Sequence, residues 1–377
     1  MAWGAVLLAV AGGTAGADDD PGDETQLQIH GFASQGALLT SGNNYLAYTK
    51  RGSLEFTEAG INFTKTLDAD LSAGLQLFAR DLGPDGTYSA KFDWLYLDYR
   101  WRDWLGLRAG RVKLPFGLYN DTSDIDAAQP VILLPQSVYP AASRNFQLAQ
   151  TGLELYGYYS IGSAGALDYH AYLGTLYLSI PPTANGIQFN NLDVPYIVGG
   201  RVLWETPLEG LRAGVSALNG EVDGSYTVPA MSAPTVIPFE LHATNWLSSI
   251  EYQDRGLFLA AEYGRSIGRS VVGPTTVHTT AEHLYGLVGY RWRSWLQTTA
   301  YYSLLYPDVE HRSGQVHHQY DAAGSARFDL SPHWIVKLEG HFLRGTAALS
   351  SDLNDNKPLS DLANQWWLLA AKTTVYF

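Results

Sequence analysis

The sequence contains no cysteine, which excludes disulfide bonds, thiolate metal sites and cysteine nucleophiles together. Charged residues are also scarce, at 16% of the chain, whereas soluble proteins usually carry about 25%. Aromatic residues, by contrast, reach 13%. A chain with few charges and many aromatic rings indicates that something other than water faces much of the protein surface.

Long hydrophobic runs and an excess of positive charge are missing as well. Beyond the N-terminal residues, no apolar run approaches the roughly twenty residues that a membrane helix needs. A helical membrane protein is therefore excluded. The chain has 24 Lys and Arg against 37 Asp and Glu, and this acidic balance argues against nucleic acid as a partner, which would require a basic face.

The N-terminus is typical of a secretory signal. Residues 1–10 read MAWGAVLLAV, and the small residues that follow end in Ala15-Gly16-Ala17, as a signal-peptidase site does. Asp18-Asp19-Asp20-Pro21 comes next and would break any helix that continued from the apolar run. We expect residues 1–17 to be a signal peptide and residues 18–377 to be one β-barrel.

The remaining chain alternates between apolar and polar residues with a period of two, which predicts β-strands. In the run 71–80, the odd positions are Leu, Ala, Leu, Leu and Ala, while the even positions apart from Phe78 are small or polar. The runs 167–173, 334–343 and 365–377 repeat the pattern. One face of each strand is therefore suited to lipid and the other to water.

Short turns alternate with long polar segments along the chain, which is how bacterial outer-membrane barrels are built. The short connections lie at residues 66–70, 101–104, 161–165, 206–210, 253–256, 293–294 and 331–333, and the long ones near 40–51, 81–90, 117–148, 178–195, 221–242, 266–281, 306–318 and 345–363. Counting the runs predicts an all-β fold, a transmembrane antiparallel up-and-down barrel of about 16 strands. A sheet in hydrocarbon must close on itself, because its backbone groups cannot be left unpaired.

The aromatic residues and three patches of the sequence carry a resemblance to a known family. Tyr and Trp gather near the ends of the runs, as aromatic girdles would. The last strand ends in Phe377 with apolar or aromatic residues at alternate positions, and it resembles the signal read by the barrel-assembly machinery. The other two patches are His30-Gly-Phe-Ala-Ser-Gln-Gly36 and Leu105 to Tyr119. They resemble the trimeric porins of Gram-negative outer membranes, and in particular the branch that includes the phosphate-selective and dicarboxylate-selective channels.

The resemblance implies that residues 117–148 fold inward as a constriction loop. An inward loop with carboxylates opposite wall arginines would set a field across the pore, as charged rings do in other channels. Basic residues line the anion path in the phosphate-selective relatives, but this chain has no lysine-rich patch, so phosphate specificity does not follow. The constriction residues that we expect are Asp121, Asp124, Asp126, Arg144, Arg111 and Lys113.

Odd and even positions of a strand face opposite sides of the sheet, and this parity predicts which charged residues face the lumen. Placing Arg or Lys against lipid at mid-membrane would cost about 2–4 kcal/mol each, so charges on the polar faces should point inward. We expect the pore wall to include Arg80, Arg108, Arg201, Arg327, Glu58 and Glu154.

Arg111 and Lys113 do not fit this scheme, because they share parity with Leu105 and Leu107 on the lipid face. Either Gly110 hosts a bulge that reverses the facing, or the strand has already risen above the hydrocarbon.

The expected function is passive diffusion of small hydrophilic or charged solutes through a homotrimer in the outer-membrane lipid, with no catalytic residue, cofactor or metal. His311, His317 and His318 lie close together but lack the spacing of a metal site. Two alternatives remain: a barrel plugged by its own loops that acts as an adhesin or structural protein, and a barrel hydrolase. No G-x-S-x-G motif supports the hydrolase.

Overall fold

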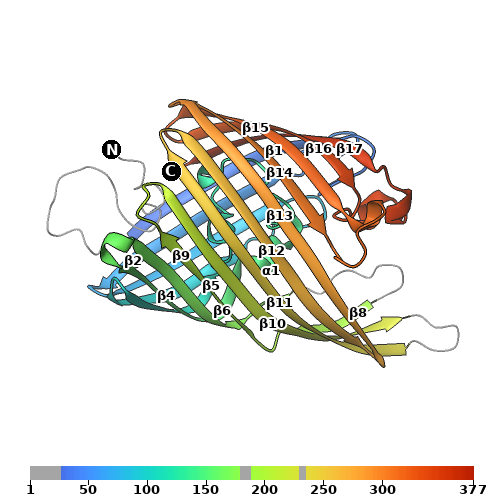
Figure 1. Ribbon diagram of the computed structural model, residues 1–377, viewed down its shortest axis with the longest axis horizontal. Coiled ribbons are helices and arrows are strands. Elements are labelled where there is room, and N and C mark those ends of the chain that lie inside the picture. The colour runs from blue at the N-terminus through green and yellow to red at the C-terminus, as the bar shows by residue number, and fades with distance from the viewer. Residues whose placement is uncertain (1–26, 179–187, 229–234) are drawn as a thin grey trace.

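The computed structural model describes residues 27–178, 188–228 and 235–377, which form one closed β-barrel (Figure 1). The predicted signal peptide, residues 1–17, lies outside the described residues. The strands are β1 (Leu27–Thr40), β2 (Thr57–Asp68), β3 (Leu71–Asp81), β4 (Lys91–Arg102), β5 (Leu105–Lys113), β6 (Ala149–Ser160), β7 (Ala166–Thr175), β8 (Gln188–Asp193), β9 (Ile197–Glu205), β10 (Leu211–Val228), β11 (Thr235–Asp254), β12 (Leu257–Val272), β13 (Thr275–Arg293), β14 (Leu296–Tyr306), β15 (Gln319–Ser331), β16 (Trp334–Gly345) and β17 (Gln365–Tyr376).

Every strand pairs antiparallel with its neighbours, and the sheet closes because β1 pairs with both β2 and β17. Phe32, for example, lies opposite Gly60 on one side and Tyr376 on the other. The short β8 and the strand β9 both pair with β10, so together they fill one position in the wall. The fold is an all-β, antiparallel closed barrel of 16 strands, as predicted.

Short turns close one end of the barrel, which we call the turn end, and the long segments lie at the opposite loop end. All seven predicted short connections are confirmed, since each falls between two consecutive strands. Two predicted long loops, 221–242 and 266–281, are wrong, and a third, 178–195, contains strand β8. Strand β10 continues to Val228, and strand β11 already begins at Thr235. Strands β12 and β13 are joined by a tight turn at Gly273. Their Gly, Pro and acidic residues read as loop signals, but the period-two alternation of apolar residues continues through them.

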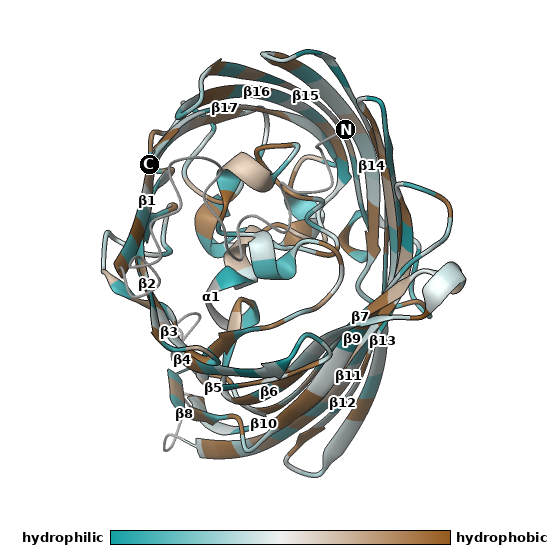
Figure 2. Cartoon of the chain, turned by 90° about the vertical axis from the view of Figure 1, so that its left-hand side faces the viewer, coloured by the Kyte–Doolittle hydropathy of each residue, from teal (hydrophilic) through white to brown (hydrophobic). Residues whose placement is uncertain are grey.

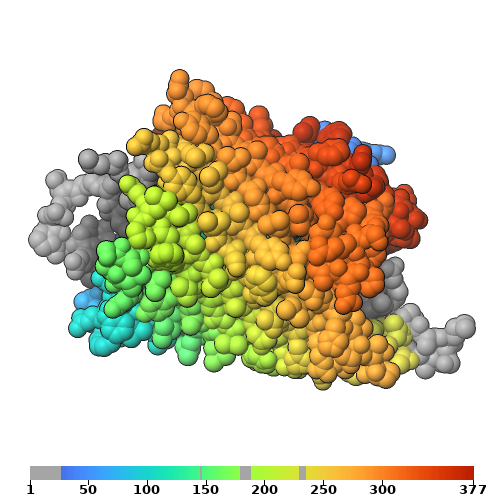
Figure 3. All heavy atoms as spheres, viewed as in Figure 1, coloured from blue at the N-terminus to red at the C-terminus, as the bar shows by residue number. Residues whose placement is uncertain are grey.

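The outer wall carries many exposed apolar side chains, and its atoms form a continuous surface in the view of Figure 3. Leu338, Leu369 and Val375 are about half exposed on this wall, while Lys337, Glu339 and Lys372 between them are buried inside. The predicted parity is therefore confirmed for β16 and β17. Exposed tryptophans cluster beside the short turns, as an interfacial girdle does; they are Trp101, Trp104, Trp204, Trp292, Trp295 and Trp334.

The helices are short and belong to the segments that connect the strands. The single α-helix of the described residues is α1 (Arg144–Gln147), and none of the helices there is long and apolar enough to cross a membrane. The 3-10 helices are η1 (Asn120–Thr122), η2 (Asp126–Ala128), η3 (Ala141–Ser143), η4 (Gly162–Ala164), η5 (Gln315–His317), η6 (Asp352–Asn354) and η7 (Leu359–Asp361). Helix α1 and its neighbours lie within the ring of strands in the view along the barrel (Figure 2).

Candidate functional site

The segment between β5 and β6, residues 114–148, folds into the barrel, and we call it the inner loop. Its middle, Val131 to Leu134, is apolar and buried. Leu134 packs with Tyr285 and Tyr301 of the wall. Gly117 begins the inward course with φ near +64°, and a Cβ there would collide with the hydroxyl of Tyr139. The burial of this apolar stretch explains why the segment leaves the solvent and enters the lumen.

The first acidic residues of the inner loop pair with the wall on two sides. Asp121 accepts two hydrogen bonds from the Arg201 guanidinium of β9, at 3.2 and 3.1 Å. Asp124 lies 2.7 Å from the Lys113 ammonium and accepts a 2.8 Å hydrogen bond from the Gln76 amide of β3. Bidentate and charge-assisted bonds of this kind fix position as well as charge.

Asp126 bridges two lysines of the last two strands. Its carboxylate lies 3.1 Å from Lys337 and 3.2 Å from Lys372, and it accepts a 2.8 Å hydrogen bond from Thr374. Lys372 also pairs with Glu58 of β2 at 2.8 Å. The side chain of Lys337 is fully buried, so Asp126 supplies the carboxylate that makes this buried ammonium tolerable.

Two arginines hold the other end of the inner loop. Arg144 of α1 donates to both carboxylate oxygens of Asp93 in β4, at 3.1 and 2.6 Å, and its guanidinium stacks 3.8 Å from the Phe78 ring centroid. Arg80 of β3 donates to the Ala141 carbonyl at 2.8 Å and pairs with Asp85. Both side chains are buried, and within the described residues their Nε atoms have no protein acceptor.

Buried glutamates of the wall hold the backbone of the inner loop. Glu339 of β16 accepts hydrogen bonds from the amides of Ile132 and Leu133 at 2.6 and 2.9 Å. Glu262 of β12 accepts from the Leu118 amide at 3.0 Å and from the Tyr139 hydroxyl. The inner loop is therefore tied to strands on every side of the lumen rather than hanging from one.

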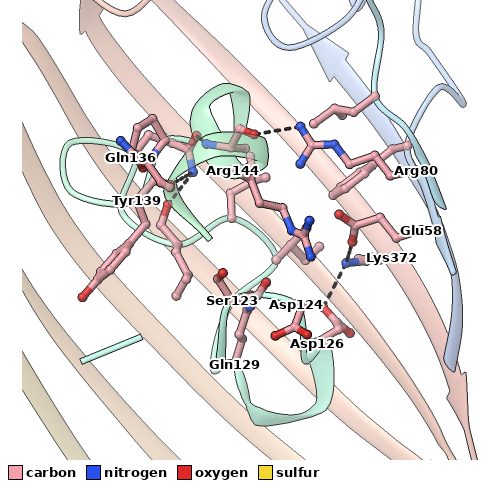
Figure 4. Close-up of a pocket in the computed structure, with 18 of the residues that line it drawn as sticks. Glu58, Arg80, Ser123, Asp124, Asp126, Gln129, Gln136, Tyr139, Arg144 and Lys372 are labelled. Carbon is pink, nitrogen blue, oxygen red and sulfur yellow. Dashed lines mark hydrogen bonds and ion pairs between the residues drawn. The ribbon is translucent and has the colours of Figure 1, made fainter. Parts of the chain in front are cut away.

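A cavity of about 70 Å³ lies between the inner loop and the β2, β3 and β17 wall. Figure 4 shows Arg144 in its centre, Arg80, Glu58 and Lys372 along the wall, and Asp124 and Asp126 below. It has room for a few water molecules. Basic and acidic groups therefore meet at one small water-accessible point of the lumen.

Burial alone would raise the pKa of Asp126, but the ammonium groups of Lys337 and Lys372 outweigh it and hold that pKa well below its usual range. The same balance acts on Asp124, where burial is outweighed by Lys113 and Arg144 and the pKa is again lowered. These carboxylates are therefore charged at neutral pH, and their anchoring bonds are complete there.

The structure places all the predicted constriction residues near the inner loop, but in different roles. Asp121, Asp124, Asp126, Arg144 and Lys113 are members of the ion pairs described above. Arg111 donates to the Asp93 carbonyl at 2.9 Å. Pairing of β5 with β4 and β6 runs through Gly110 without a register shift, so Gly110 hosts no bulge.

The predicted wall residues fall into two groups. The first group contacts the inner loop directly and consists of Arg80, Arg201 and Arg327, the last of which donates to the Ala127 carbonyl. Glu58 belongs to the same group but contacts the loop indirectly, through Lys372. Arg108 and Glu154 instead pair with one another at 3.1 Å. They belong to a cluster with Asp98 and His170. This cluster is linked to the inner loop through Asp168, which lies 3.1 Å from His170 and 3.9 Å from Arg201, the partner of Asp121.

Sequence reasoning missed Asp93 and Tyr139. Asp93 shares parity with Leu95 and Leu97, which face outward, so alternation placed it on the lipid side. The pairing of β3 with β4 shifts between Gln76 and Leu77 and skips Asp93, and this bulge turns its carboxylate inward. Tyr139 lies in the inner loop, where no periodicity was present to signal its role.

Two outer segments pack above the inner loop. Residues 41–56 and 346–364 meet at Asn354, whose side chain accepts a 2.8 Å hydrogen bond from the Asn44 amide and donates a 3.0 Å one to the Asn44 carbonyl. Tyr45 and Trp366 join Ile132 and Leu133 in one apolar cluster within this end of the barrel. In the described ranges, no group of three or more His, Asp or Glu side chains is arranged to hold a metal ion.

No family model and no curated protein matches the sequence. Solved structures match the fold: the anion-selective porin from Comamonas acidovorans has 12% identity and a TM-score of 0.59, covering 94% of this chain and 100% of the porin. The outer membrane channel DcaP of Acinetobacter baumannii has 11% identity and a TM-score of 0.58, covering 97% and 100%. The trimer form of OmpT of Vibrio cholerae has 10% identity and a TM-score of 0.56, covering 94% and 100%. The chain therefore has the fold of Gram-negative outer-membrane porins.

Proposed function

We propose that the protein is a diffusion channel of the outer membrane that passes small hydrophilic or charged solutes and catalyses no reaction. The observation that carries this proposal is the inner loop, tied across the lumen of a 16-strand barrel whose interior face bears many charges. A barrel of this strand number encloses an aqueous interior unless something fills it. The similarity to porins in fold supports the same function.

Selection at the inner loop would be electrostatic and weak. Its carboxylates and the basic wall residues form pairs, so a passing ion meets alternating signs over a few ångströms rather than one large charge. The guanidinium groups of Arg80 and Arg144 line the cavity and present positive charge to an anion there. Passage requires that such contacts be favourable enough for entry and weak enough for release. The assignment to the phosphate- or dicarboxylate-selective branch stays a prediction.

We further propose that the protein is a homotrimer in the outer membrane, inserted by the barrel-assembly machinery. The similar OmpT structure is a trimer form. The exposed tryptophans beside the turns and the apolar outer wall fit a membrane on the outside of the barrel. The loop end would then face away from the cell, as long loops do in bacterial barrels.

A second candidate function is a plugged barrel that acts as an adhesin or structural protein. One observation favours it: apolar clusters lie inside the barrel, where residues 41–56 and 346–364 pack on the inner loop. Such packing narrows the space left to solutes. The two functions differ in a property that is simple to measure, which is whether solutes cross.

The test is swelling of liposomes that contain the refolded chain, in isosmotic solutions of neutral sugars of increasing size. A channel predicts swelling that slows steeply as the sugar becomes larger. A correctly folded barrel that leaves the rate at the level of empty liposomes for every sugar would favour the plugged barrel.

A further inference from the structure

Four strands of the wall are longer than a membrane requires. Strands β10 to β13 have 18, 20, 16 and 19 residues, whereas about 9–11 residues cross a bilayer. Their ends at the loop end pair with one another and with β8, and they reach the lower right of Figure 1. We call this part, residues 188–193, 219–228, 235–244, 267–272 and 275–280, the projecting sheet.

Within the projecting sheet, strands β10 and β11 reverse the polarity of the wall below them. Ser216 of β10 bonds to the inner loop and Leu247 of β11 is buried, so even positions of β10 and odd positions of β11 face inward. Register between these strands is continuous to their ends. In β10 and β11, the inward face of the projecting sheet is therefore largely apolar and carries Val222, Tyr226, Ile237, Phe239 and Leu241, while the outward face carries Glu221, Asp223, Glu240 and His242.

Three aromatic rings form the centre of this inward face. Phe189, Tyr226 and Phe239 lie with ring centroids 5.9 to 6.0 Å apart and with mutual tilts of 41° to 83°. Gly224 lies beneath them, since a Cβ there would come within 2.6 Å of the Phe239 ring. All three side chains are only partly buried. We call this group the aromatic trio.

The apolar surface continues from the aromatic trio to the inner loop. Val222 and Leu218 of β10 pack against a buried cluster formed by Val194, Ile197, Tyr172 and Leu114. Leu114 is the first residue of the inner loop. An apolar track thus leads from the rim of the barrel to the base of the segment that narrows it.

We propose that the aromatic trio and this track bind small aromatic solutes that carry a polar or charged group, and deliver them to the inner loop. This rests on the proposed channel function. A solute is the occupant that fits, because the surface faces the lumen and continues down to the pore, whereas a protein partner would need an outward face. Tyr and Phe offer rigid contact area for a ring, in edge-to-face or offset geometry. Binding at such an open site is weak, as transport demands.

The test is saturation-transfer NMR of the refolded full chain in detergent, with benzoate as the aromatic probe and propionate as a probe of equal charge without a ring. We expect transfer to the benzoate ring and little to propionate. The double variant Phe239→Ser with Tyr226→Ser should weaken benzoate binding by about tenfold, the effect of losing one or two aromatic contacts. The gentler variant Gly224→Ala, which displaces the Phe239 ring, should weaken it less.

The matched control is Val236→Ser with Glu240→Ser on the outward face of the same strand, which should leave benzoate binding unchanged. Equal transfer to benzoate and propionate, or equal benzoate binding by the double variant and the wild type, would overturn the proposal. A change of oligomeric state in the double variant alone would also overturn it, because the face would then be an interface between copies. Channels that conduct but bind no benzoate would refute this inference alone, and benzoate binding without conductance would refute only the proposed function.

Discussion

Removing the charge of Asp126 should loosen the inner loop more than any other single neutralisation of its carboxylates. Asp126 pairs with Lys337, whose side chain is fully buried, and with Lys372, whose side chain is 4% exposed. Lys372 keeps Glu58 as a second carboxylate. Among the described residues, Lys337 then keeps only carbonyl oxygens as partners, those of Asp126 and Val131. The variant Asp126→Asn therefore leaves one buried ammonium without a counter-ion.

Breaking a buried ion pair by removing one partner costs about 3–5 kcal/mol. Asparagine keeps a hydrogen-bond acceptor for Lys337, so we take the lower figure. The substitution should therefore lower the free energy that holds the loop in its anchored position by about 3 kcal/mol. At 1.4 kcal/mol for each factor of ten, this raises the open fraction of the loop roughly a hundredfold. Amide hydrogen exchange reports such local opening directly.

The assay is hydrogen exchange with mass spectrometry on peptides that cover residues 126–134, in the refolded protein. The amides of Ile132 and Leu133, which bond to Glu339, should exchange about a hundredfold faster in Asp126→Asn than in the wild type. The control is Asp355→Asn, at an exposed acid of another loop whose side chain is 69% accessible, where no change is expected. Exchange in Asp126→Asn that stays within about threefold of this control would refute the reasoning.

Three other predictions concern selectivity, acid and the membrane face. Arg144→Glu should shift the cation-to-anion permeability ratio toward cations, because it places a carboxylate beside Asp93 and Asp124; an unchanged reversal potential would remove Arg144 from the solute path. The pKa values of Asp124 and Asp126 are lower in the folded protein than the ordinary value of about 4. Their ionised carboxylates therefore stabilise the anchored loop at any pH above about 4, and this stabilisation is lost as the pH falls through the lower pKa values of the folded protein. Pepsin should therefore spare the inner loop at about pH 4 and cleave it only in stronger acid, and cleavage at about pH 4 would contradict this. Leu338→Arg on the outer wall should destabilise the barrel in urea unfolding from lipid vesicles by about 2–4 kcal/mol, whereas Leu330→Arg at the turn end should cost about 0–1 kcal/mol, and equal costs would argue against a membrane at that depth.

The wall of the barrel could be predicted from the sequence because its signals are local. Alternation in residues 71–80 and 334–343 assigned both the strand and its facing, and the turn residues marked the short connections. The turn residues misled in β10 and β11, since Gly224 and Pro238 looked like loop residues while cross-strand pairing keeps them in the sheet.

The inner loop could be predicted only in outline. Its inward course was expected from a resemblance, and the role of its charged residues in a constriction stays a prediction. Their partners could not be found, because Asp126 meets Lys337 and Lys372 across more than two hundred residues of chain. Asp93 shows a second limit, since a single bulge reverses the facing that alternation assigns.

Single-channel recording of the refolded chain in a planar bilayer, with reversal potentials under a salt gradient, tests the central claim most directly. The account predicts discrete conductance steps in groups of three, with a reversal potential that shifts when Arg144 is replaced by Glu. A correctly folded barrel that never conducts would contradict the proposed channel and favour a plugged barrel.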